Sequence, residues 1–146
     1  MDERARGRVA GFFQNKNYFG DYDNGRVYAL SQDVYTDYGN PIVRNRTSPI
    51  VWNARERVYY DSIEIDVERG QGLATGQGSD PKLMLRWSND SGYTYNSKRQ
   101  IDLGKTGKYR TRVRLDRLGQ ARERVFEVTF SDPIKFNLLG FFADIS

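Results

Sequence analysis

Ile63-Glu64-Ile65-Asp66-Val67-Glu68 alternates apolar and acidic residues. Successive side chains leave opposite faces of an extended strand, so a period of two is typical of a strand with one buried face. The same alternation recurs in residues 82–87, 108–115 and 125–130, whose apolar members are largely β-formers. The sequence therefore predicts several half-buried strands. Trp87 shares an apolar face with Leu83 and Leu85, so we expect its ring to be buried.

Turn-forming residues separate these runs, for example at Asp23-Asn24-Gly25, Asn89-Asp90-Ser91-Gly92 and Ser131-Asp132-Pro133. No helix of ten or more residues is expected. This punctuation predicts an all-β fold, either an antiparallel β-sandwich or propeller-derived sheets. Composition changes near residue 50, which predicts an N-terminal segment over 1–50 and an antiparallel all-β domain over 51–146. The glycine-rich stretch 70–81 is expected to be a flexible loop.

The chain has 146 residues, which suits a small globular protein, and it contains neither Cys nor His. This absence excludes Cys/His zinc sites, thiol nucleophiles and histidine-based catalytic triads. No pair of carboxylates stands out for glycoside hydrolysis, so we expect no enzyme, no metal and no cofactor. No apolar run approaches the roughly 20 residues of a membrane span, so no membrane anchor is expected.

The net charge of +4 is unevenly distributed. Residues 98–124 hold ten cations and three anions, a balance of +7 that leaves −3 for the remainder. Four of these cations alternate along one predicted strand face, and a fifth follows the strand: Lys108, Arg110, Arg112, Arg114 and Arg117. The row could contact DNA phosphates, or it could face acidic residues of a neighbouring strand or subunit. Glu64, Asp66 and Glu68 are the candidate counter-charges.

A second motif lies at residues 88–95, where Ser88, Asp90, Gly92, Thr94 and Tyr95 fit the spacing Ser-x-Asp-x-Gly-x-Thr-aromatic. The motif resembles the Asp-box, a hairpin turn of sialidases and other β-propellers. Within such a turn Asp90 would accept backbone N–H bonds and Gly92 would adopt a positive φ, while Thr94 and Tyr95 would begin the returning strand. We expect a structural turn, because the Asp-box lies apart from sialidase active sites.

The order of the motifs along the chain carries a wider resemblance. The series is Tyr18-Phe19-Gly20-Asp21, Asn24-Gly25-Arg26-Val27-Tyr28, Tyr35 to Ile42, Arg57-Val58-Tyr59-Tyr60-Asp61, Ile63 to Gly70, Asp80-Pro81, the turn after Arg86-Trp87, Leu103 to Tyr109, Ala121 to Phe126 and Ser131 to Ile134. It resembles the C-terminal part of the packaged-DNA stabilisation protein of short-tailed phages, the tail hub or nozzle. The family has Gly and Trp where this chain has Ser91 and Tyr95.

The resemblance implies a virion structural protein, made in the host cytoplasm and placed in the phage tail. It implies a ring, a hexamer in the family, that lies below the portal, closes the DNA channel and helps to retain packaged DNA. Other tail and portal-adaptor proteins would be its partners, with non-specific contact to packaged DNA. Family proteins are several hundred residues long, so this chain would be a C-terminal part of such a protein or a shortened version of it. Residues 1–50 would resemble the end of a propeller blade.

Two alternatives remain open at this point. A carbohydrate-binding β-sandwich could stack sugars on Trp52, Trp87, Tyr93 and Tyr95. A free-standing DNA-binding β domain could use the face from Lys108 to Arg114, with an affinity that falls steeply with salt.

Overall fold

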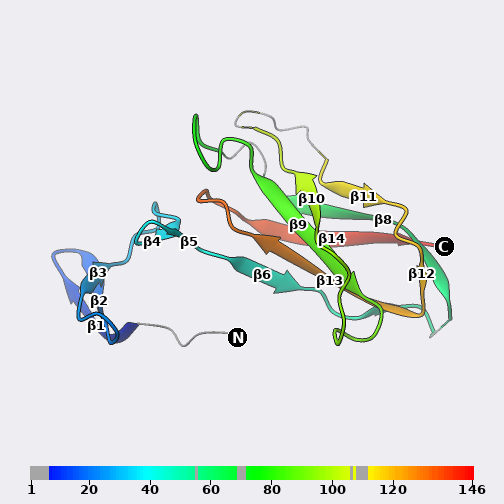
Figure 1. Cartoon of the computed structure of the whole chain (residues 1–146), viewed down its shortest axis with the longest axis horizontal. Coiled ribbons are helices and arrows are strands. Elements are labelled where there is room, and N and C mark those ends of the chain that lie inside the picture. Colours follow the sequence, from blue (N-terminus) through cyan, green and yellow to red (C-terminus); the bar gives the residue numbers. More distant parts are fainter. Residues whose placement is uncertain (1–6, 55, 69–71, 106, 108–111) are drawn as a thin grey trace. The chain divides into compact units, whose positions relative to one another are not determined.

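The structure is a computed structural model, and it describes residues 7–54, 56–68, 72–105, 107 and 112–146. Contacts divide the chain into two units, residues 1–34 and 35–146. Figure 1 follows the strands along the chain. No helix occurs in the described part, so none there could span a membrane. The predicted all-β class is confirmed.

The first unit is a three-stranded antiparallel sheet in the order β1-β2-β3. Its strands are β1 (Gly7–Phe13), β2 (Lys16–Asp21) and β3 (Val27–Ala29). Gln14 and Asn15 both have positive φ, which suits the tight two-residue turn between β1 and β2. Asp21 is the only buried residue in the described part of this unit. The assignment of a propeller-blade origin to this segment stays a prediction.

The second unit begins with a small hairpin, β4 (Thr36–Asp37) and β5 (Asn40–Pro41). The remaining strands are β6 (Arg44–Thr47), β7 (Val51–Trp52), β8 (Val58–Val67), β9 (Lys82–Ser88), β10 (Arg99–Asp102), β11 (Arg114–Asp116), β12 (Gln120–Ala121), β13 (Glu123–Phe130) and β14 (Leu138–Ile145). They form two antiparallel sheets. One has the order β10-β9-β13-β6, with β7 also paired to β13; in the other, β8 pairs with β11, β12 and β14.

Alternating residues of both sheets meet in one hydrophobic core, as in a β-sandwich. β8 contributes Ile63 and Ile65, β9 contributes Leu83 and Leu85, and β13 contributes Phe126, Val128 and Phe130. Trp87 is also buried, as its place in the sequence predicted. β6 pairs with β13 from Arg44 to Thr47, so residues ahead of the predicted boundary at 50 already belong to the second unit.

The alternation of β8 changes phase near Asp61. Val58 and Tyr60 face the core, and so do Ile63, Ile65 and Val67. On the β14 side, Ser62 pairs with Asp144 but Tyr60 pairs with Ile145, which leaves Asp61 as an extra residue. On the other side Arg117, with φ of 60°, donates its backbone N–H to the carbonyl of Asp61 at 2.8 Å. This is a β-bulge, which re-aims the strand.

Two local expectations need correction. The strand predicted over 108–115 is placed at Arg114–Asp116, and residues 108–111 lie outside the described residues. The strand after the turn begins at Arg99 and not at Thr94. The described part of the glycine-rich stretch contains no strand, and residues 73–77 are exposed, whereas Gly78, whose φ is 97°, is buried beside Ile134. The flexibility of this loop stays a prediction.

Candidate functional site

The outer face of the β8 sheet carries the predicted acidic row. Because Ile63, Ile65 and Val67 turn inward, Glu64 and Asp66 turn outward between β14 and β11. Arg112 Nη2 lies 2.8 Å from Glu64 Oε2, so one predicted cation meets one predicted counter-charge. The pairing joins residues 48 positions apart in the sequence. This ion pair agrees with the alternative in which the basic row faces acidic residues of the same sheet. A cation that is already paired with a carboxylate is less available to bind a phosphate.

The other predicted charges have different partners. Arg114 Nε lies 2.6 Å from Asp116 Oδ1, and this hydrogen bond holds the pKa of the Arg114 guanidinium above its ordinary value. Glu68 accepts hydrogen bonds from Lys135 Nζ at 3.0 Å and from Asn137 Nδ2. The side chain of Arg117 is exposed beside the bulge. Lys108 and Arg110 lie outside the described residues, so the row is only partly placed.

The turn at residues 88–95 is a dense hydrogen-bonded unit. Asp90 accepts from the Ser88 hydroxyl, from the Thr94 hydroxyl and from the Thr94 backbone N–H at 2.8 Å. The Gly92 N–H donates to Ser88 Oγ at 2.9 Å, and Gly92 has a φ of 96°. The hydrogen bonds from Ser88 and then from Thr94 lower the pKa of the Asp90 carboxyl to about 2. Asp90 is therefore ionised at neutral pH, as an acceptor of several donors must be.

This turn is also fixed to the rest of the sandwich. The Ser91 hydroxyl donates to Glu123 Oε1 on β13, and the Trp87 backbone N–H donates to Asn96 Oδ1 at 2.7 Å. Gly92 lies against the hydroxyl of Tyr95, where a Cβ would approach to 3.2 Å. The guanidinium carbon of Arg86 in turn lies over the ring of Tyr95, 4.3 Å from the centroid of that ring. All five predicted turn residues are thus brought together, with Tyr95 packed between Gly92 and Arg86.

Sequence reasoning missed the residue beneath the turn, Arg124. Its guanidinium is buried and donates to the carbonyl of Leu118 at 2.7 Å and to Asn89 Oδ1 at 2.8 Å. It also lies 4.3 Å from the ring centroid of Tyr60 and 5.5 Å from that of Trp87. Burial lowers the pKa of Arg124 and raises that of Tyr60. The burial of Arg124 could have been predicted, because Arg124 lies on the same face of β13 as Phe126, Val128 and Phe130.

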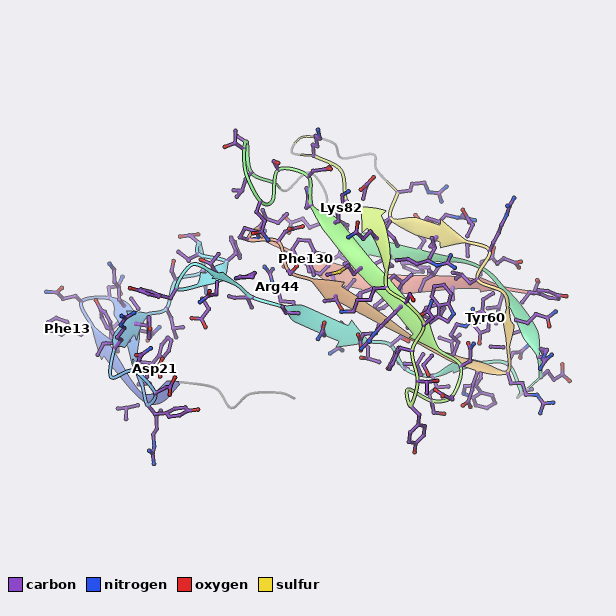
Figure 2. All side chains as sticks on the ribbon, in the orientation of Figure 1. Phe13, Asp21, Arg44, Tyr60, Lys82 and Phe130 are labelled. Carbon is purple, nitrogen blue, oxygen red and sulfur yellow. The ribbon has the colours of Figure 1, made fainter. Side chains whose placement is uncertain are left out.

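A second arginine, Arg44, joins the start of β6 to the chain after β13. Its two terminal nitrogens donate to the carbonyls of Ile134 at 3.1 Å and Asp132 at 3.0 Å. Its guanidinium lies 5.2 Å from the centroid of Phe130 and 5.9 Å from that of Tyr35. Figure 2 labels Arg44 and Phe130. Burial lowers the pKa of Arg44. Arg124 is buried and Arg44 is partly buried, and both serve packing, since each binds mainly backbone carbonyls and aromatic rings.

The aromatic residues considered for sugar stacking do not form one platform. Trp87 is buried with only 7% of its surface exposed, whereas Tyr93 is 89% exposed at the tip of the turn. Trp52 is exposed on β7, opposite Glu123. Tyr95 is partly buried under Arg86. In the described residues no group of three or more acidic side chains has the arrangement of a metal site.

The comparison with protein families agrees with this architecture. The family described as Bacteriophage P22 Gp10, beta-sandwich, matches residues 43–146. The matched range contains both sheets of the sandwich, the turn, Arg44 and Arg124, and it covers more than half of the chain. No curated protein sequence matches the chain. The chain belongs to the P22 Gp10 β-sandwich family, a family of tail hub or nozzle structural proteins from short-tailed phages.

Proposed function

We propose that this chain is a component of a phage tail hub or nozzle that works by assembly and not by catalysis. In this role copies form a ring below the portal, close the channel through which DNA leaves, and help to retain packaged DNA. The family match over residues 43–146 is the observation that carries the proposal. Partners would be other tail and portal-adaptor proteins in the virion, after synthesis in the host cytoplasm.

The structure of the sandwich supports a mechanical role. The turn at 88–95 and the sheet beneath it are joined by side-chain hydrogen bonds at Ser91–Glu123 and Asn89–Arg124. Such bonds hold a loop in one geometry, and a fixed geometry is what a subunit of a closed ring requires. The role of the family and the rigidity of this turn both favour a structural function.

The basic segment is proposed to contact a neighbouring subunit more than DNA. Arg112 already pairs with Glu64, and Arg114 pairs with Asp116. A cation that is paired within its own subunit neutralises fewer phosphates, and so it adds less to DNA affinity. Arg117 is the described cation of the row whose side chain is exposed and for which no carboxylate partner is shown. Among the described cations of this face, we therefore expect mainly Arg117 to make non-specific contact with DNA.

The test uses phage particles assembled with variants of this protein. Arg112→Glu combined with Arg117→Glu reverses charge on the face, and Arg8→Glu combined with Arg26→Glu is the matched control in the first unit. We expect the first pair to reduce the fraction of particles with complete tails and to release DNA as a consequence. Tail-complete particles that lose DNA would favour direct DNA contact. Particles unaffected by either pair would contradict a role for this face.

A further inference from the structure

The guanidinium of Arg124 lies between two loops that come from different sheets of the sandwich. Its Nε donates to Asn89 Oδ1 at 2.8 Å, in the turn that follows β9. Its Nη1 donates to the Leu118 carbonyl at 2.7 Å, and its Nη2 to the Gln120 carbonyl at 3.5 Å, where the chain passes from β11 to β12 (Figure 1). β9 belongs to one sheet, and β11 and β12 belong to the other. One side chain therefore binds acceptors on both sheets.

This buried cation has no counter-charge. Arg124 is 1% exposed, and among the described residues it forms no ion pair. Burying a cation without a carboxylate costs free energy, so its charge does not explain its place in the core. A guanidinium differs from other side chains in offering five N–H donors in one rigid plane. The arrangement therefore favours a geometric role, in which this plane fixes the two loops relative to each other.

The loop on the second sheet, residues 117–119, is called the corner below. The Leu118 N–H donates to the Tyr60 carbonyl at 3.0 Å, and the Tyr60 N–H donates to the Gly119 carbonyl at 2.9 Å. These bonds hold the corner to β8, while Arg124 binds the Leu118 carbonyl from the core side. The Leu118 N–H is thus an amide whose protection reports whether the corner is closed.

The turn at 88–95 is tied to β13 at two positions. One is the bond between Asn89 and Arg124, and the other is the bond from the Ser91 hydroxyl to Glu123 Oε1. Only the first continues to the corner, because no hydrogen bond joins the Glu123 side chain to the corner in the described part of the chain. The two positions therefore provide a test and its control.

We propose that Arg124 is a positioning residue that couples the turn at 88–95 to the corner at 117–119. The corner has two states, the closed form and a locally opened form. When either Asn89 or Leu118 moves away, the guanidinium is left buried with an unpaired donor, which is unfavourable. It then shifts towards water and weakens its bond to the other loop. Opening of one loop therefore promotes opening of the other.

The coupling joins two exposed side chains that belong to different sheets. Tyr93 is 89% exposed at the tip of the turn, and the side chain of Arg117 is exposed at the corner. A partner that holds the turn at Tyr93 would reduce opening of the corner and so fix the position of Arg117. This inference concerns one subunit and does not depend on the proposed function.

The experiment measures hydrogen exchange of the Leu118 N–H by NMR. Asn89→Leu removes the acceptor of Arg124 from an exposed position, and we expect Leu118 to exchange at least about fivefold faster. Asn89→Asp keeps an acceptor and should restore the slow rate. Ser91→Ala is the matched control, because it removes the other tie of the turn, and it should leave the Leu118 rate unchanged. Equal acceleration by Asn89→Leu and Ser91→Ala, or no acceleration by either, would overturn the proposal.

Coupling between two sites is reciprocal, so the corner must also act on the turn. Gly119 has a φ of 75° and open space at its Cβ position, so Gly119→Ala strains only the backbone of the corner. We expect faster exchange of the Thr94 N–H in this variant. Gly76→Ala is the control, at a φ of 78° in the glycine-rich loop. An unchanged Thr94 rate, or an equal change at the core amide of Ile65, would reject a local coupling.

Discussion

The three-stranded unit and the β-sandwich use the same kind of strand but bury very different amounts of it. In the sandwich, seventeen of the described residues form one buried hydrophobic cluster. In the first unit Val9, Phe12 and Phe13 are exposed, and Phe19 and Tyr28 form an aromatic pair with ring centroids 5.6 Å apart. Backbone pairing alone gives little stability in water, whereas buried apolar area gives much. Strand pairing thus defines the first unit, and side-chain packing stabilises the second.

The largest expected effect comes from the sandwich core. Phe126 is 1% exposed and its ring meets that of Tyr60 edge-on at 6.1 Å. Phe126→Ala removes this contact and leaves a cavity, so urea denaturation should show a loss of about 3–5 kcal/mol. Phe12→Ala, at an exposed position of the first unit, is the control and should change stability little. Equal losses at the two positions would remove the contrast between the units.

The next effect concerns Arg124. Arg124→Met keeps an unbranched side chain but leaves the Leu118 carbonyl and the Asn89 amide without their donor. Leaving a buried acceptor unpaired costs about 1–3 kcal/mol, which denaturant unfolding can resolve. The exposed neighbour Arg122 supplies the control, since Arg122→Met should stay within about 0.5 kcal/mol of the wild type. A neutral Arg124→Met would mean that the apolar stem, and not the guanidinium, stabilises the turn.

A smaller effect is expected from pH. The pKa of Asp90 is lowered from 3.8 to about 2 by bonds from Ser88 and Thr94, so the folded state favours its ionised form. Its contribution is complete above about pH 4 and is lost as the pH falls through about 2. Tm should therefore fall more between pH 4 and pH 2 in the wild type than in Asp90→Asn. Parallel Tm profiles would show that this carboxylate does not link stability to pH.

The smallest expected change follows removal of residues 1–34. Since contacts divide the chain after Val34, the remaining sandwich keeps its core intact. Its unfolding free energy should match that of the whole chain within about 0.5 kcal/mol. A larger loss would show that the first unit stabilises the second and would weaken the comparison.

Sequence periodicity was sufficient to predict those strands whose apolar residues alternate over a long run. It identified the inward face of Ile63, Ile65 and Val67 and the burial of Trp87, because a period of two leaves one interpretation. It did not reveal β6, whose Arg44 is partly buried against Phe130, or the bulge at Asp61. Both depend on neighbouring strands that come from distant parts of the chain.

The candidate site was predictable to a similar extent. The spacing from Ser88 to Tyr95 located the turn, because all its hydrogen bonds are local. The partners of the charges were harder to predict. Glu64 is a predicted counter-charge and pairs with Arg112, but Glu68 is bonded to Lys135 and Asn137, which come after β13. Charge patterns show which residues need a partner, whereas the topology decides which partner lies within reach.

The position of β8 has a consequence for the order of folding. β8 is central in its sheet, and its neighbours β11, β12 and β14 all come later in the sequence. β14 pairs with it across a long separation, from Ile145 back to Tyr60. Closing such a loop costs chain entropy before any contact forms, which slows folding. During synthesis, the β14 side of β8 stays without its strand partner until residue 145 has emerged from the ribosome, so this sheet is completed only after translation has passed its last strand.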